Sequence, residues 1–258
     1  MKKRLLFWVP ILAIAVAGAA FALPASPFYL PDFLVRGGYH DGHSTRYWVK
    51  ALNDPDAAAR ARAAHSLGAI GPEAEVAVPE LARVLRQDPD PGPRVEAAMA
   101  LTKMRPASRA AVPALTEALA DEDRQVRMNV VIALSGLGEA ARPAIPALIR
   151  AMQDETNQTN VGHFSFTIRE EAAIALGRAS AGTAEAVPAL TEALRTASTV
   201  PMREATARAL GTVGAEARPA VPLLQALLKD KDSAQPWIVE QALNRIEGKP
   251  EGEARATP

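Results

Sequence analysis

The chain has 258 residues with 29 basic and 29 acidic side chains, so its formal net charge is zero. This balance argues against nucleic acid as a partner, because binding to nucleic acid depends on a basic surface. The chain contains no cysteine, which excludes disulfides, thiolate metal sites and cysteine nucleophiles. Apolar residues make up 48% of the chain, much of it alanine, so the composition favours an α-helical protein.

The N-terminus has the pattern of an export signal. Basic residues at 2–4 precede an apolar run at 5–23. Residues 20–22, Ala-Phe-Ala, fit a cleavage site, whereas the length of the run also suffices to cross a bilayer. We therefore expect residues 1–23 to be a signal peptide or a membrane anchor, and both alternatives stay open. In either case the basic flank stays in the cytoplasm and the remainder is exported.

This start predicts an extracytoplasmic protein. It is either periplasmic or tethered to the cytoplasmic membrane through residues 5–23, with the remainder outside the cytoplasm. Residues 24–43 are rich in proline and glycine, and we expect an irregular stalk. Residues 249–258 are polar, and we expect a disordered tail.

A Val-Pro or Ile-Pro dipeptide recurs between these two ends, with steps of 34, 33, 42 and 34 residues. An arginine recurs with the same four steps, and a leucine follows each arginine by seven residues. The dipeptides begin at Val78, Val112, Ile145, Val187 and Val221, and the arginines are Arg60, Arg94, Arg127, Arg169 and Arg203. A period of this length is typical of a solenoid, so we predict an array of repeats.

The unit that begins at Val112 shows the expected form of one repeat. Pro113 is tolerated in the first turn of a helix, where its missing N–H has no helical partner. The helical spacing of apolar residues predicts a second helix from about Gln125 to Leu137, ended by Gly138. Each repeat is therefore expected to be two helices, A and B.

Aspartates recur in the turn between the two helices, next to the repeated arginines. Asp121 and Asp123 are the pair in this unit, and their side chains can cap the following helix. Acids at the equivalent turns are Asp54, Asp56, Asp88, Asp90, Asp230 and Asp232. We interpret these residues as a structural ladder that links neighbouring repeats.

These features resemble the HEAT-repeat family, in particular the short bacterial repeats also called PBS-lyase HEAT-like. The resemblance covers about 44–248, and six units fit. The residues that carry it best are Asp54, Pro55, Asp56, Arg60, Ala63, Ala64, Leu67, Gly68, Ile70 and Gly71. The resemblance implies an all-α solenoid of about six two-helix repeats, in which the B helices line a concave face.

The unit that begins at Ile145 carries an insertion of eight or nine residues within 154–167. The insertion is polar and then contains His163, Phe164 and Phe166. Insertions in repeat proteins form loops on one face and often bind partners. A tolerated surface extension is the other interpretation, because lengthening a loop costs little entropy.

A second candidate site lies on the B helices, at positions one and five residues after each arginine. These positions share one helical face. In the second and third repeats they hold Val95, Met99, Met128 and Ile132, an apolar patch suited to a peptide or helix. Packing between repeats is the competing interpretation.

Catalytic and metal motifs are weak. His40 and His43 are three residues apart without a third ligand nearby, so we expect no metal. Some HEAT-like enzymes bind di-iron through His-Glu pairs, and this sequence contains no such dipeptide. We therefore expect no cofactor and no enzyme activity, but an exported or tethered scaffold that binds a protein or peptide. The alternatives are a HEAT-like enzyme of lyase type and a purely structural spacer of the bacterial cell envelope.

Overall fold

The computed structural model describes residues 38–162, 164–230 and 234–249. The expected signal or anchor at 1–23, most of the expected stalk, His163 and nearly all of the expected tail lie outside these residues. Those expectations therefore remain predictions. Within the described ranges, no helix combines the length and the apolar character needed to cross a membrane.

Twelve α-helices in the described part of the chain pair into six units. The A helices are α2 (Thr45–Ala51), α4 (Val78–Gln87), α6 (Val112–Ala118), α8 (Ile145–Gln153), α10 (Val187–Thr196) and α12 (Val221–Lys229). The B helices are α3 (Ala57–Ile70), α5 (Pro91–Lys103), α7 (Arg124–Leu137), α9 (Ile168–Ala179), α11 (Val200–Val213) and α13 (Pro236–Glu247). The predicted all-α solenoid of six two-helix repeats is confirmed.

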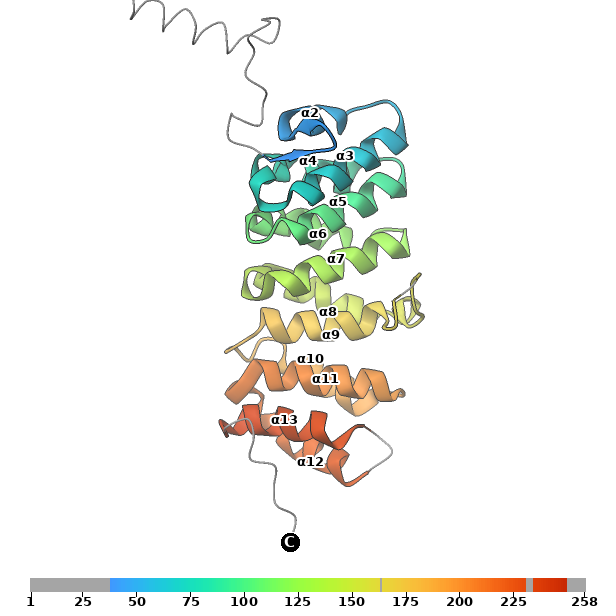
Figure 1. Cartoon of the computed structure of the whole chain (residues 1–258). Coiled ribbons are helices and arrows are strands. Elements are labelled where there is room, and N and C mark those ends of the chain that lie inside the picture. Colours follow the sequence, from blue (N-terminus) through green and yellow to red (C-terminus); the bar gives the residue numbers. More distant parts are fainter. Residues whose placement is uncertain (1–37, 163, 231–233, 250–258) are drawn as a thin grey trace, which may run out of the picture.

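The units stack in chain order along one axis, from α2 at one end to α12 and α13 at the other (Figure 1). Each B helix packs against the next B helix, and the A helices form a second layer behind them. We call the solvent-facing side of the six B helices the B face.

Short 3-10 segments carry the chain from most B helices to the next A helix. They are η2 (Gly71–Ala77), η3 (Ala107–Ala111), η4 (Gly138–Ala144) and η6 (Gly214–Ala220), and a fifth, η5 (Glu155–Asn157), lies in the insertion. Each of the five recurring Val-Pro or Ile-Pro dipeptides starts an A helix, with its proline in the first turn. The dipeptide therefore marks the start of a helix, as its spacing predicted.

The unit that begins at Val112 matches its prediction closely. Helix α7 starts one residue before the expected Gln125 and ends at Leu137. Gly138 follows with φ of 56°, a backbone conformation that a residue with a side chain rarely adopts. The Asp123 side chain accepts hydrogen bonds from the backbone N–H groups of Gln125 and Val126 and caps the helix.

The core runs without interruption through all six units. The repeated leucine of each of the first five B helices is completely buried, and these leucines are Leu67, Leu101, Leu134, Leu176 and Leu210. Small residues bring the B helices close together. A Cβ added at Gly177 would lie 2.6 Å from the Cα of Ala209 in the next B helix. The alanine-rich composition therefore serves tight stacking of the B helices.

A small β-hairpin covers the first unit, in part of the segment expected to be irregular. Strands β1 (Tyr39–His40) and β2 (His43–Ser44) pair antiparallel. Two hydrogen bonds join the hairpin to α2, from Trp48 Nε1 to the His40 carbonyl oxygen at 3.1 Å and from Thr45 Oγ1 to the Gly38 carbonyl oxygen at 3.0 Å. Residues 38–43 therefore form an end cap of the array, because they supply contacts that a preceding repeat would otherwise make.

Candidate functional site

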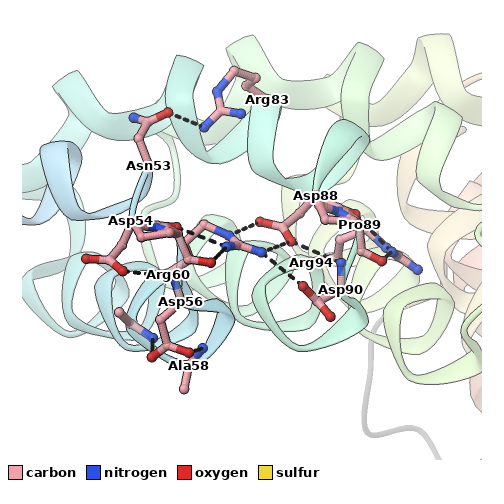
Figure 2. Close-up of polar contacts among 12 residues, drawn as sticks. Asn53, Asp54, Asp56, Ala58, Arg60, Arg83, Asp88, Pro89, Asp90 and Arg94 are labelled. Carbon is pink, nitrogen blue, oxygen red and sulfur yellow. Dashed lines mark hydrogen bonds and ion pairs between the residues drawn. The ribbon is translucent and has the colours of Figure 1, made fainter.

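The repeated arginines form the expected ladder at the turn between helices A and B (Figure 2). Arg60 of the first unit donates through Nε and Nη2 to the two carboxylate oxygens of Asp88 in the second unit, both at 2.7 Å. Its Nη1 donates to the backbone carbonyl oxygens of Asp54 and Pro55 in its own turn, both at 3.0 Å. Each arginine of this kind therefore fixes its own turn and ties it to the next unit.

The pKa of Asp88 reflects this contact. Burial disfavours the charged form of the Asp88 carboxyl, which is only 4% exposed. Hydrogen bonds from the Arg60 guanidinium and from the backbone of Asp90 outweigh this effect and hold the pKa of Asp88 below its ordinary value. The ion pair is therefore a stabilising contact of the folded array.

The next two steps of the ladder differ in charge. Arg94 Nη2 donates to Asp121 Oδ1 at 2.9 Å, which repeats the ion pair of the first step. Arg127 Nε donates at 3.1 Å to the side-chain oxygen of Asn157, so a neutral amide takes the place of the aspartate. Sequence reasoning missed Asn157 because the insertion shifts it out of the regular spacing.

The insertion folds back onto the ladder at its start and caps the next B helix at its end. Asn157 is 1% exposed, and its amide donates to the Ala151 carbonyl oxygen at 3.1 Å. Arg124 donates to the backbone oxygen of Thr159 at 2.8 Å. Thr167 caps α9, and its side chain and that of Glu170 form a reciprocal capping box. The two ends of the insertion are therefore fixed to the array.

The two phenylalanines predicted in the insertion lie side by side. The ring centroids of Phe164 and Phe166 are 5.4 Å apart, and both side chains are partly buried against the core. His163, the third candidate residue in the insertion, lies outside the described residues. The structure gives the phenylalanines a packing role, and a role in binding stays a prediction.

The predicted apolar patch on the B helices divides into buried and partly exposed side chains. Met128 is 0% exposed and belongs to the core. This burial agrees with the alternative interpretation, in which the position packs between repeats. Val95 and Ile132 are partly buried and pack against that core. Met99 is partly exposed and is not among the apolar side chains packed against the core. Met99 is therefore the partly exposed residue of the four that is not packed against the core.

One row of side chains crosses the B face at the position five residues after each arginine. The row consists of His65, Met99, Ile132, Ile174 and Arg208, one residue from each of five consecutive B helices. Its three central members are apolar and partly exposed. We call these five residues the central row.

Charged contacts flank the central row at both ends. His65 Nδ1 lies 3.1 Å from Glu96 Oε2, between the first and second units. The Arg208 guanidinium lies 5.8 Å from the ring centroid of Trp237, which is 56% exposed. Sequence reasoning missed Trp237, although it lies one residue after Pro236, which occupies the arginine position of the last unit.

A buried carboxyl lies beside the row, between the third and fourth units. Burial raises the pKa of Glu171 above its ordinary value, against the effects of a hydrogen bond from Ser135 and of the positive charge of Arg178. Arg178 Nη1 also donates to Ser135 Oγ at 2.7 Å. These three residues link α7 to α9 on the B face.

The described residues offer little for metal or acid–base chemistry. They include no group of three or more His, Cys, Asp or Glu side chains placed to hold a metal ion. His40 and His43 are partners in the β-hairpin, and the His43 ring stacks on Tyr47 at a centroid distance of 3.8 Å. The B face is therefore an apolar strip with polar contacts at its ends, an arrangement suited to binding.

Solved structures support the repeat fold. An engineered protein superposes with a TM-score of 0.57 at 25% identity, covering 79% of this chain and 96% of that chain. The CpcE–CpcF complex of phycocyanin lyase from Nostoc sp. gives 0.51 at 24% identity, covering 78% and 86%. Computationally designed armadillo repeat proteins for modular peptide recognition give 0.56 at 18% identity, covering 79% and 99%.

Sequence comparison places the chain in a family. No curated protein matches it. A family model described as HEAT repeats matches residues 78–163 and 161–244, which together make up more than half of the chain. The matched segments contain the ladder from Asp88 onward, the insertion and most of the B face. This chain therefore belongs to the HEAT-repeat family.

Proposed function

We propose that this protein is a scaffold that binds a segment of another protein along the B face, and that it is not an enzyme. The observation that carries the proposal is the apolar centre of the central row, where Met99, Ile132 and Ile174 are partly exposed on three consecutive B helices. Apolar side chains spaced along a rigid surface suit the alternate side chains of an extended segment or one face of a helix.

The polar contacts at the two ends of the row support a defined binding surface. The His65–Glu96 pair and the Arg208–Trp237 contact present polar groups around an apolar centre. Protein interfaces commonly combine an apolar core with a polar rim, and Trp and Arg are enriched among residues that dominate binding energy. The designed armadillo proteins that share the fold were made for peptide recognition, which agrees with this use of the surface.

The proposal includes location outside the cytoplasm. It rests on the basic residues at 2–4 and the apolar run at 5–23, which have the pattern of an export signal or anchor. The scaffold would then hold its partner in the cell envelope, either free or close to the membrane. Fractionation of cells that produce the full-length protein tests this part, because a cytoplasmic protein would contradict it.

Site-specific photo-crosslinking tests the binding surface. A photo-reactive amino acid replaces Met99 in one full-length variant and Val76 in a second. Val76 is the matched control, because it is an apolar side chain 71% exposed on η2, away from the B helices. We expect position 99 alone to give a discrete crosslinked partner.

A binding assay with an apolar-to-charged variant tests whether the Met99 side chain itself contributes to binding. Met99→Glu should lose the partner in a binding assay while its circular dichroism stays helical. Met128→Glu should unfold, because Met128 is completely buried. Equal crosslinking at positions 99 and 76, or full binding by a folded Met99→Glu variant, contradicts the proposal.

A further inference from the structure

The arginine ladder lacks an acceptor side chain from the next unit at the step that begins at Arg169. Arg60 and Arg94 each donate to an aspartate that lies six residues before the arginine of the next unit. Arg127 donates to Asn157, which takes the place of that aspartate in the insertion. Arg169 of the fourth unit has Ala197 at the corresponding place in the fifth unit. An alanine side chain cannot accept a hydrogen bond, so this step has no acceptor side chain.

Backbone contacts establish that Ala197 occupies the aspartate position. Arg60 donates to the carbonyl oxygen of Asp54, six residues before it. Arg203 likewise donates to the carbonyl oxygen of Ala197, six residues before it, at 3.1 Å. Ala197 therefore lies in its turn where Asp54 lies in the first unit, with a methyl group in place of the carboxylate.

The contacts of Arg169 differ accordingly. Its Nε donates to the carbonyl oxygen of Met152 at 2.8 Å and its Nη1 to Gln158 Oε1 at 3.3 Å. No carboxylate of the described residues lies within ion-pair distance of its guanidinium. The Asp154 carboxylate accepts the backbone N–H of Thr156 at 2.9 Å. Hydrogen bonds from Thr156 and, after them, the positive charges of Arg127 and Arg169 hold the pKa of Asp154 below its ordinary value.

A pocket of about 480 Å³ opens at the place of the missing aspartate. Arg169 and Ala197 both line it, together with the exposed hydroxyl of Ser198. Among the described residues, Ser198 makes no hydrogen bond through this hydroxyl, which leaves it available as a donor. The pocket is therefore lined by a cation and by a hydroxyl donor, together with the alanine that replaces the aspartate.

The acidic side chains of the pocket limit the charge of a ligand. Glu155 and Glu170 also line it. Glu170 Oε2 already accepts the backbone N–H of Thr167 at 2.9 Å, whereas Glu155 is exposed and can accept from a ligand. One guanidinium can neutralise a single carboxylate but not a multiply charged anion such as a phosphate group, which the two carboxylates also repel more strongly. A single carboxylate with an N–H group nearby fits this arrangement.

We propose that this pocket binds a carboxylate group, which pairs with Arg169 in the place of the missing ladder aspartate. The pocket contains no residue of the central row, and the proposal does not depend on the function proposed for the B face. A carboxylate and a guanidinium form paired hydrogen bonds of matching geometry, as Arg60 and Asp88 already do in this chain. The source is either an acidic side chain of a bound protein or a small carboxylic acid.

Nuclear magnetic resonance of the arginine Nε–Hε groups in the full-length protein tests this site. The probes are propionate and the capped peptide acetyl-Gly-Glu-Gly-amide, and Arg169→Lys assigns the relevant signal by its loss. We expect both probes to shift the Arg169 signal saturably. The Arg60 signal should stay in place, because its acceptor is already present. Tighter binding of the peptide, by tenfold or more, would indicate a protein side chain as the source, and equal binding a small acid.

Ala197→Asp is the decisive variant, since it restores the residue found at the equivalent position of the second and third units. We expect the new carboxylate to occupy the pocket and to weaken binding of both probes at least tenfold. Unchanged Arg60 and Arg94 signals in the variant show that the array is intact. The proposal is overturned by shifts that do not saturate, by equal shifts of Arg60 and Arg169, or by unchanged binding in a folded Ala197→Asp variant.

Discussion

The Arg60 guanidinium donates to both oxygens of the Asp88 carboxylate, with Nε···Oδ2 and Nη2···Oδ1 distances of 2.7 Å. The two residues belong to neighbouring units and are 28 positions apart in the chain. Both side chains are largely buried, at 12% and 4% exposure. In a repeat protein each unit contacts only its neighbours, so a contact of this kind contributes directly to the coupling between units.

Replacing Asp88 tests that coupling. Asp88→Asn keeps the shape of the side chain but removes the charge that Arg60 faces. We expect a loss of about 1–3 kcal/mol in the free energy of unfolding, because a largely buried guanidinium loses its bidentate counter-charge and keeps only the more exposed carboxylate of Asp90 at 3.1 Å. Urea denaturation at neutral pH measures it. Glu192→Gln is the control: its pair with Arg195 is 53% and 64% exposed and should leave the urea midpoint in place.

The same aspartate makes the array sensitive to acid. The pKa of Asp88 is lowered in the fold, so its contribution is fully present above its unfolded pKa and is lost as the pH falls through the lowered value. We expect the difference in urea midpoint between wild type and Asp88→Asn to be constant near neutrality and to shrink below about pH 4. A difference that persists unchanged at about pH 2 would show that the ion pair is not its cause.

Much of the fold was predictable because the same contact recurs in successive repeats and places the same residue types at a regular spacing. The spacing of Val-Pro and arginine predicted the helix pairs, and α7 begins within one residue of its expected start. The ladder followed from acids that recur beside arginines, and two of its ion pairs are present. A physical requirement that every unit shares leaves a periodic signal in the sequence, and such a signal needs no structure to be recognised.

The candidate site was less predictable because it depends on differences between units. Met128 and Val95 occupy equivalent positions, yet only Met128 is completely buried. The exposure of one position depends on the side chains of the two neighbouring helices, which periodicity does not report. Asn157 was missed for a related reason, since the insertion moves it out of register and its amide replaces the expected carboxylate.

Because the B helices pack closely, we expect one added methyl group between them to lower the free energy of unfolding. In Gly177→Ala the new Cβ would lie 2.6 Å from the Cα of Ala209, and that contact is with backbone. The two helices must move apart, and we expect a loss of about 1–3 kcal/mol in the free energy of unfolding. Thermal and urea denaturation both measure it.

Gly92→Ala is the matched control for that loss. Gly92 also lies in a B helix, α5, but a Cβ there meets no atom within 4 Å. Alanine restricts the unfolded chain more than glycine does, so this variant should gain about 0.4–1 kcal/mol. Equal losses in both variants would indicate that intrinsic backbone effects, and not the contact between helices, determine the result.

The buried carboxyl of Glu171 predicts a stability difference with the opposite dependence on pH. Because burial raises the pKa of Glu171, its contribution is fully present below the unfolded pKa of about 4.3 and is lost as the pH rises through the raised value. Glu171→Gln keeps a group that can hydrogen-bond Ser135 but cannot ionise. We therefore expect its melting temperature to exceed that of wild type at about pH 8 and to equal it at about pH 4.

Calorimetry across this range measures the difference, with Glu139→Gln as the control, since Glu139 is an exposed carboxylate on η4. A Glu171→Gln variant that is less stable than wild type at alkaline pH would show that the charge of Glu171 stabilises the contact between α7 and α9 through Arg178, and would refute the dominance of burial.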